Sequence, residues 1–153
     1  MHKFARYGIV AALAVAGCLC LAGCGSDEPV EEQEPQVESD YEVSIDGAYL
    51  TEDYEGNDAI AIEFTWTNNS EETTSFAAAA MPTVFQDGVE LEMAITTEVD
   101  TAGYTKELKP GATTEVALAY ELDGDSEVEV EVEELISLDD VVLASETFDP
   151  ASL

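Results

Sequence analysis

The chain is poor in the residues that carry most catalytic and metal-binding chemistry. Its 153 residues include one histidine and three cysteines. The histidine is His2 and the cysteines are Cys18, Cys20 and Cys24, so residues 25–153 contain neither type. Serine–histidine and cysteine–histidine catalysis need a histidine, and zinc sites are built largely from histidine and cysteine. These classes of site are therefore excluded for residues 25–153.

Basic residues are almost as scarce. The chain has four Lys or Arg residues and 35 Asp or Glu residues. Lys3 and Arg6 precede the first acid, so the chain from residue 24 onward keeps two bases and 35 acids, a net charge of −33. Nucleic acids are bound by basic patches that displace counterions. We therefore expect no nucleic-acid partner. Carboxylate chemistry remains, either hard cations bound by oxygen or, more remotely, a hydrolase that uses an acid pair.

The first 23 residues have the pattern of a secretory signal. A short basic start is followed by residues 8–23, which carry no charge and are mostly Ala, Val, Leu and Cys. A membrane-spanning helix needs about 20 apolar residues. A shorter apolar run after a basic start is typical of a signal peptide that is removed.

The sequence "LAGC" at residues 21–24 closes this segment. It resembles the lipobox of bacterial lipoproteins, with a leucine three positions before the cysteine and small residues between them. The resemblance implies that residues 1–23 are removed and that Cys24 carries lipid. The protein would then be held to the outer face of the cytoplasmic membrane. Because no cysteine follows Cys24, the secreted domain has no disulfide and depends on an ordinary core.

Residues 24–40 follow as an acidic segment with prolines, glutamines and almost no apolar side chains. Such a composition buries too little surface to offset the cost of ordering. We expect a disordered tether that reaches at most about 60 Å when fully extended.

From residue 41 onward apolar residues alternate with polar ones. The clearest case is "AIAIEFTWTN", which puts Ile60, Ile62, Phe64 and Trp66 on one face. Residues 112–122 and 127–133 alternate in the same way, and Asp87-Gly88 is a hairpin signal. About seven or eight short strands at regular spacing predict an all-β fold, an immunoglobulin-like antiparallel β-sandwich over residues 41–153.

Three stretches support this prediction by resemblance. They are "AIAIEFTWTNNSEETTSF", "VFQDGVELE" and "KPGATTEVALAYEL". Together they are similar to a family of uncharacterised bacterial lipoprotein domains, over about residues 41–136. The resemblance implies an immunoglobulin-like fold and brings no catalytic residue. Residues 76–81 are ambiguous, because their four alanines favour helix, but we expect them to continue a strand.

Two features of the strands have both a structural and a functional interpretation. Trp66 shares a face with apolar residues, which indicates the core rather than a ligand platform. Glu127, Glu129, Glu131 and Glu133 alternate with valines. The favoured interpretation is a solvated strand face that prevents edge-to-edge aggregation. The alternative is a surface that binds cations or a basic partner.

Two acidic turns are candidate calcium sites, because alternating loop oxygens can surround this cation. Neither turn fits the EF-hand pattern. The candidate ligands are Asp53, Glu55 and Asp58 in the first turn, and Asp123, Asp125 and Glu127 in the second.

Taken together, these patterns predict a membrane-anchored, extracytoplasmic module that binds an unknown protein or cationic partner and is not an enzyme. Its acidic field would steer that partner, and no cofactor is required. A calcium-dependent structural or adhesion module is the alternative.

Overall fold

The computed structural model describes residues 39–137 and 141–153. The predicted signal peptide (1–23), the lipidation site Cys24 and all but the last two residues of the predicted tether (24–40) lie outside these residues. Within them, no helix is both long enough and apolar enough to cross a membrane.

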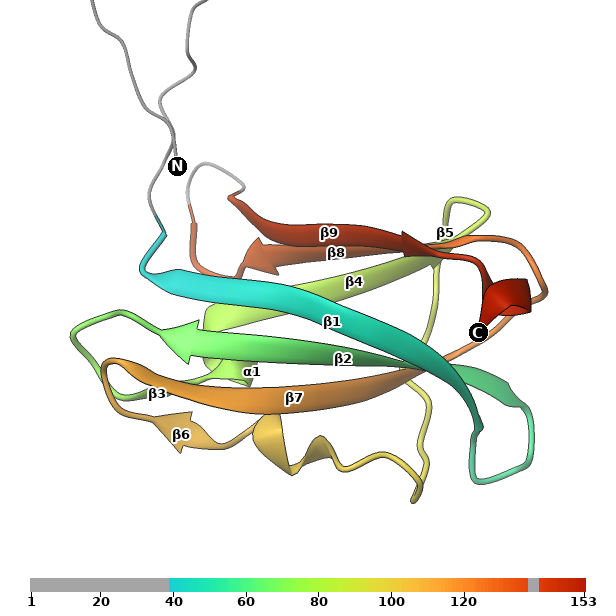
Figure 1. Cartoon of the computed structure of the whole chain (residues 1–153), viewed down its shortest axis with the longest axis horizontal. Coiled ribbons are helices and arrows are strands. Elements are labelled where there is room, and N and C mark those ends of the chain that lie inside the picture. Colours follow the sequence, from blue (N-terminus) through green and yellow to red (C-terminus); the bar gives the residue numbers. More distant parts are fainter. Residues whose placement is uncertain (1–38, 138–140) are drawn as a thin grey trace, which may run out of the picture. The chain divides into compact units, whose positions relative to one another are not determined.

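The described part of the chain is an all-β sandwich, as the alternation predicts (Figure 1). It has six strands of seven or more residues and three strands of two residues. The long strands are β1 (Tyr41–Glu52), β2 (Asp58–Asn68), β4 (Ala80–Gln86), β7 (Ala112–Glu121), β8 (Val128–Glu134) and β9 (Val142–Phe148). The short elements are β3 (Thr74–Ser75), α1 (Phe76–Ala79), β5 (Val89–Glu90), η1 (Thr101–Gly103), β6 (Glu107–Leu108) and η2 (Pro150–Ser152).

Two antiparallel sheets form the sandwich. One has the order β1-β2-β7 and the other β5-β4-β8-β9, while β3 and β6 pair separately. An immunoglobulin fold places strands A, B and E in one sheet and C, F and G in the other, and variable-type domains add C′ beside C. The observed order matches A-B-E and C′-C-F-G. The sequence-based fold class is therefore confirmed.

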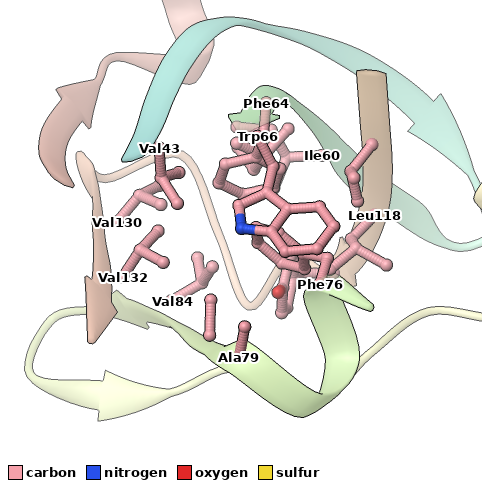
Figure 2. Packing of buried hydrophobic residues seen from close by; sticks show 14 of the residues in the cluster. Val43, Ile60, Phe64, Trp66, Phe76, Ala79, Val84, Leu118, Val130 and Val132 are labelled. Atoms are coloured by element: carbon pink, nitrogen blue, oxygen red, sulfur yellow. The ribbon is translucent and has the colours of Figure 1, made fainter. Parts of the chain in front are cut away.

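β2 is the central strand of its sheet and the main source of the core. Its register places Ile60, Ile62, Phe64 and Trp66 opposite inward residues of β7, and all four are fully buried. Figure 2 shows the Trp66 indole between Leu118 of β7 and the valines Val130 and Val132 of β8. Trp66 also packs edge-on against Phe76, with ring centroids 6.1 Å apart. The prediction that Trp66 is a core residue is confirmed.

The alanine run does not continue a strand, contrary to the sequence-based expectation. Phe76–Ala79 form a single helical turn, and the strand begins at Ala80. In a helix, residues three apart lie on one face, so Phe76 and Ala79 are both buried while Ala78 is exposed. The high helix propensity of alanine favours this turn. It carries the chain from β3 to β4 in the opposite sheet.

The glutamate-bearing strand β8 is not an edge strand. It lies between β4 and β9, pairing Val130 with Val84 on one side and with Glu146 on the other. Its glutamates therefore cannot serve to block edge pairing, and that part of the interpretation was wrong. The alternation itself is confirmed, because Val128, Val130 and Val132 are buried in the core.

The Tyr120 side chain is almost fully buried, yet its hydroxyl has no hydrogen-bond partner within the described residues. Burial raises the pKa of this phenol, with smaller contributions from Tyr104 and Glu90. A buried hydroxyl without a partner costs about 1–3 kcal/mol.

We predict that Tyr120→Phe increases the free energy of unfolding by about 1 kcal/mol, because it removes this uncompensated group. Chemical denaturation of residues 25–153 measures the change. Tyr54→Phe is the control, since Tyr54 is 69% exposed. A loss of stability in Tyr120→Phe alone would show that the hydroxyl makes a stabilising contact.

Candidate functional site

A cavity of about 570 Å³ lies on the outer face of the β1-β2-β7 sheet, opposite the core. We call it the outer-face hollow. Its floor is the sheet and its wall is the segment that carries η1, which runs alongside β7 (Figure 1). Five carboxylates and one lysine line it, namely Asp46, Glu63, Glu98, Asp100, Glu115 and Lys106.

A β-bulge in β1 shapes the floor. The register of β1 against β2 shifts between Ile45 and Gly47, so that Asp46 is the extra residue beside Glu63. Bulges redirect side chains and often occur beside functional sites. Glu63 is flanked by Gly47 on β1 and by Ala117 on β7. These two small neighbours leave the space above the sheet open, and an added Cβ at Gly47 would meet no atom within 4 Å.

The wall is held against the sheet by a second small core and by backbone hydrogen bonds. Val99 packs against Ala61 and Ala119, whose small side chains permit close approach. The Ala94 N–H donates to the Ala119 carbonyl at 2.8 Å. A Cβ on Gly103 would overlap the backbone carbonyl of Glu115, so only glycine allows η1 to lie this close to β7.

Three of the five carboxylates already accept hydrogen bonds from nearby groups. Asp46 accepts from the Thr65 hydroxyl at 2.6 Å, Glu98 accepts from the Thr51 hydroxyl at 3.0 Å, and Asp100 caps η1. The described residues provide no such donor to the side chains of Glu63 and Glu115. Both lie on the outer face of the sheet, exposed to solvent. The hollow therefore offers two carboxylates to an incoming positive charge, within a strongly negative surround.

This fold and this chain match a known family. A family model described as a domain of unknown function (DUF5067) matches residues 26–134. The chain belongs to the DUF5067 family. The prediction of an uncharacterised domain family is thereby confirmed, and the family description gives no catalytic indication. No curated protein matches the chain.

Solved structures share the fold of this DUF5067 protein at low sequence identity. A "putative lipoprotein" of Staphylococcus aureus is 16% identical, with a TM-score of 0.56 over 74% of this chain and 86% of its own. A "putative lipoprotein" of Bacillus subtilis is 11% identical, with a TM-score of 0.56 over 74% of this chain and 38% of its own. An Enterococcus faecalis protein is 22% identical, with a TM-score of 0.51 over 72% of this chain and 85% of its own.

In the first acidic turn of the DUF5067 domain, the Asp53 carboxylate is occupied by hydrogen bonds from the turn itself. Asp53 is 7% exposed and accepts hydrogen bonds from the backbone N–H groups of Glu55 and Asn57, both at 2.8 Å. The Asn57 side-chain amide donates to its second oxygen at 2.8 Å. Hydrogen bonds from the Asn57 backbone, then from its side chain, lower the pKa of Asp53, and partial burial opposes them. The carboxylate thus shapes the turn between β1 and β2.

The second acidic turn is organised by Gln86, a buried residue that the sequence patterns did not identify. Its side-chain amide donates to the carbonyls of Gly124 and Ser126, at 3.0 and 2.8 Å. Its side-chain oxygen accepts from the Asp123 N–H at 2.9 Å. Calcium bound in a loop is often coordinated by backbone carbonyls. The carbonyls of Gly124 and Ser126 already accept hydrogen bonds from the Gln86 amide.

The six candidate calcium ligands come from two turns, and within the described residues no three of them form a group that could hold a metal ion. Asp58 and Asp125 line the same pocket, at the end of the sandwich, whereas the other four are not part of it. Residues 39–137 and 141–153 contain no group of three or more acidic, histidine or cysteine side chains that could hold a metal. The sequence patterns did not predict the residues of the outer-face hollow, because strand pairing and a distant loop bring them together.

We predict that Asp53→Asn destabilises the domain at neutral pH and flattens its acid response. Folding lowers the pKa of Asp53 from its ordinary value of 3.8, so its charged form adds stability above that pH. This contribution is lost as pH falls through the lowered, folded-state value.

The prediction is tested by measuring the unfolding free energies of the unchanged domain and of Asp53→Asn from neutral pH to about pH 2.5. The difference between the two unfolding free energies should be largest at neutral pH and should become smaller below pH 3.8, the ordinary pKa of an aspartate. The exposed Asp58→Asn serves as the control. A gap that does not change with pH would contradict the assignment.

We also predict that calcium and magnesium raise the melting temperature equally. Since the turns offer no ready cage of oxygens, both ions should act by screening a net charge of −33. Thermal unfolding of residues 25–153 in chelator, then with equal concentrations of each ion, measures this. A rise specific to calcium would instead support a calcium-dependent module and direct mutagenesis to residues 53–58 and 123–127.

Proposed function

We propose that this DUF5067 protein is a lipid-anchored, extracytoplasmic binding module of the bacterial cell envelope that carries out no catalysis. Its partner is a positively charged segment of another protein. The "LAGC" sequence at residues 21–24 supports the anchor. The shared fold with proteins described as lipoproteins in Staphylococcus aureus and Bacillus subtilis is consistent with it.

The anchor and the tether fit such a role. One acyl chain binds a membrane marginally and two bind it firmly, and the lipobox resemblance implies at least two on Cys24. The acidic residues 24–40 would then separate the domain from the membrane by up to about 60 Å. An extended tether lets the domain reach partners in the surrounding envelope.

The observation that carries the proposed binding role is the outer-face hollow. Five carboxylates and one lysine surround an open space of about 570 Å³ on a sheet face. An acidic concavity raises the local concentration of cations and accelerates their association. Glu63 and Glu115 would form the direct contacts, because the other three carboxylates already accept hydrogen bonds within the domain.

The composition of the hollow also narrows the class of ligand. Its one lysine, Lys106, gives little attraction for phosphate or nucleic acid against five carboxylates. The lining is mostly polar and open to solvent, whereas small-molecule sites are mostly apolar and enclose their ligand, so the hollow suits the side chains of an extended segment better. A basic protein segment meets both conditions.

The experiment is a titration of isotope-labelled residues 25–153 with decalysine, followed by NMR. We predict saturable shifts at the strand positions that line the hollow, weakening as salt is added. Glu63→Gln/Glu115→Gln should weaken binding about tenfold, because it removes the two available carboxylates. Glu71→Gln/Glu72→Gln is the matched control, since it removes equal charge from exposed positions in the β2–β3 connection.

Equal weakening by the two double variants would contradict the proposal, because binding would then follow net charge alone. Shifts spread over the whole surface would contradict it in the same way.

A further inference from the structure

A second cavity lies at the end of the sandwich and is less polar than the outer-face hollow. It measures about 420 Å³ and is lined by four chain segments: the end of β1, the start of β2, the β7–β8 connection and η2. We call it the end pocket. Figure 1 shows η2 and the β7–β8 connection together at this end. Its principal lining residues are Leu50, Leu122, Pro150, Leu153, Asp58 and Asp125.

Hydrogen bonds fix the walls of the end pocket without using its carboxylates. The Leu122 N–H donates to the Asp58 backbone carbonyl at 3.0 Å, which joins the end of β7 to the start of β2. Gln86 holds the turn that carries Asp125, and Asp149 caps η2. Within the described residues, no donor occupies the side chain of Asp58 or of Asp125. The pocket is thus preformed, with both carboxylates accessible.

The apolar part of the pocket is incompletely covered. Leu50 is 49% exposed and Leu153 is 45% exposed, and burying such side chains against a partner is favourable. No basic residue lines the pocket. An occupant that complements it therefore carries positive charge on an apolar stem. A lysine side chain has this structure, with four methylenes that cover apolar surface below an ammonium group.

The pocket lies far from the point where the described chain enters the domain, so a second protein can reach it without meeting that entry. The described chain enters the domain at Tyr41, and Leu50 lies nine residues further along the same strand. At about 3.3 Å per residue, the pocket is about 30 Å from that entry. The end pocket therefore lies at the opposite end of the domain from the point where the described chain enters it.

We infer that the end pocket binds a lysine side chain of a partner protein. The methylenes lie against Leu50 and Leu153, and the ammonium group faces Asp58 and Asp125. This site is separate from the outer-face hollow. Each can fail without the other, because the two cavities share no lining residue.

The test is an NMR titration of labelled residues 25–153, whose described part contains the whole core, with the peptide acetyl-Gly-Lys-Gly-amide. The matched control peptide has norleucine in place of lysine, which keeps the stem and removes the charge. We expect saturable shifts at Thr51, Ala59, Gly124 and Ala151, and affinity at least about tenfold weaker for the norleucine peptide.

Two double variants separate this site from general charge effects. Asp58→Asn/Asp125→Asn should weaken binding of the lysine peptide about tenfold. Glu71→Gln/Glu72→Gln, at exposed positions in the β2–β3 connection, should leave it within about twofold, because it removes equal charge away from both cavities. The norleucine comparison uses the unchanged protein, so it remains decisive if the aspartate variant is unstable.

Three results would overturn the inference. Equal affinity for the lysine and norleucine peptides would show that the carboxylates play no part. Equal weakening by both double variants would show attraction by net charge alone. Tighter binding of 1,5-diaminopentane than of the lysine peptide would assign the pocket to a free diamine and not to a protein partner.

Discussion

Charge is the constraint on which the rest of this structure depends. From residue 24 onward the chain has 35 carboxylates and two lysines, Lys106 and Lys109. Ion pairing can neutralise almost none of this charge, and residues 25–153 contain no cysteine that could form a disulfide. Apolar packing must therefore hold the domain together against self-repulsion. β2 supplies much of that packing, with four consecutive inward side chains that are fully buried, ending in Trp66.

The same constraint explains the division of residues between faces. Inward positions of β2, β7 and β8 are apolar, while the carboxylates lie on outward faces and turns, where water screens them. Asp53, Asn68 and Gln86 are exceptions, since all three are buried polar groups. Each satisfies several donors or acceptors of a neighbouring turn, and each thereby fixes the position of a loop at an end of the sandwich. Together with the close approach at Gly103, the contacts of Asp53 and Gln86 preform both cavities.

The sequence predicts the fold well, because alternation is a local property. The inward faces of β2, β7 and β8 and the turn at Asp87-Gly88 follow from patterns a few residues long. The position of β8 within its sheet does not, since strand order depends on long-range pairing. The helical turn at Phe76 was missed although alanine favours helix, because so short a run is marginal as a helix and the burial of Phe76 and Ala79 depends on the rest of the fold. Local sequence patterns could not predict the two cavities either. The bulge at Asp46 depends on pairing with β2, and Asp58 and Asp125 are 67 residues apart in the chain.

The central claim is that an apolar core alone sustains a domain whose charge opposes folding. Thermal unfolding of residues 25–153 at neutral pH, from low to high sodium chloride concentration, tests it most directly. The account predicts one cooperative transition at every salt concentration and a melting temperature that rises steadily with salt, as repulsion is screened. A melting temperature that does not change with salt would contradict the opposing role of charge. Loss of the cooperative transition at low salt would contradict the sufficiency of the core.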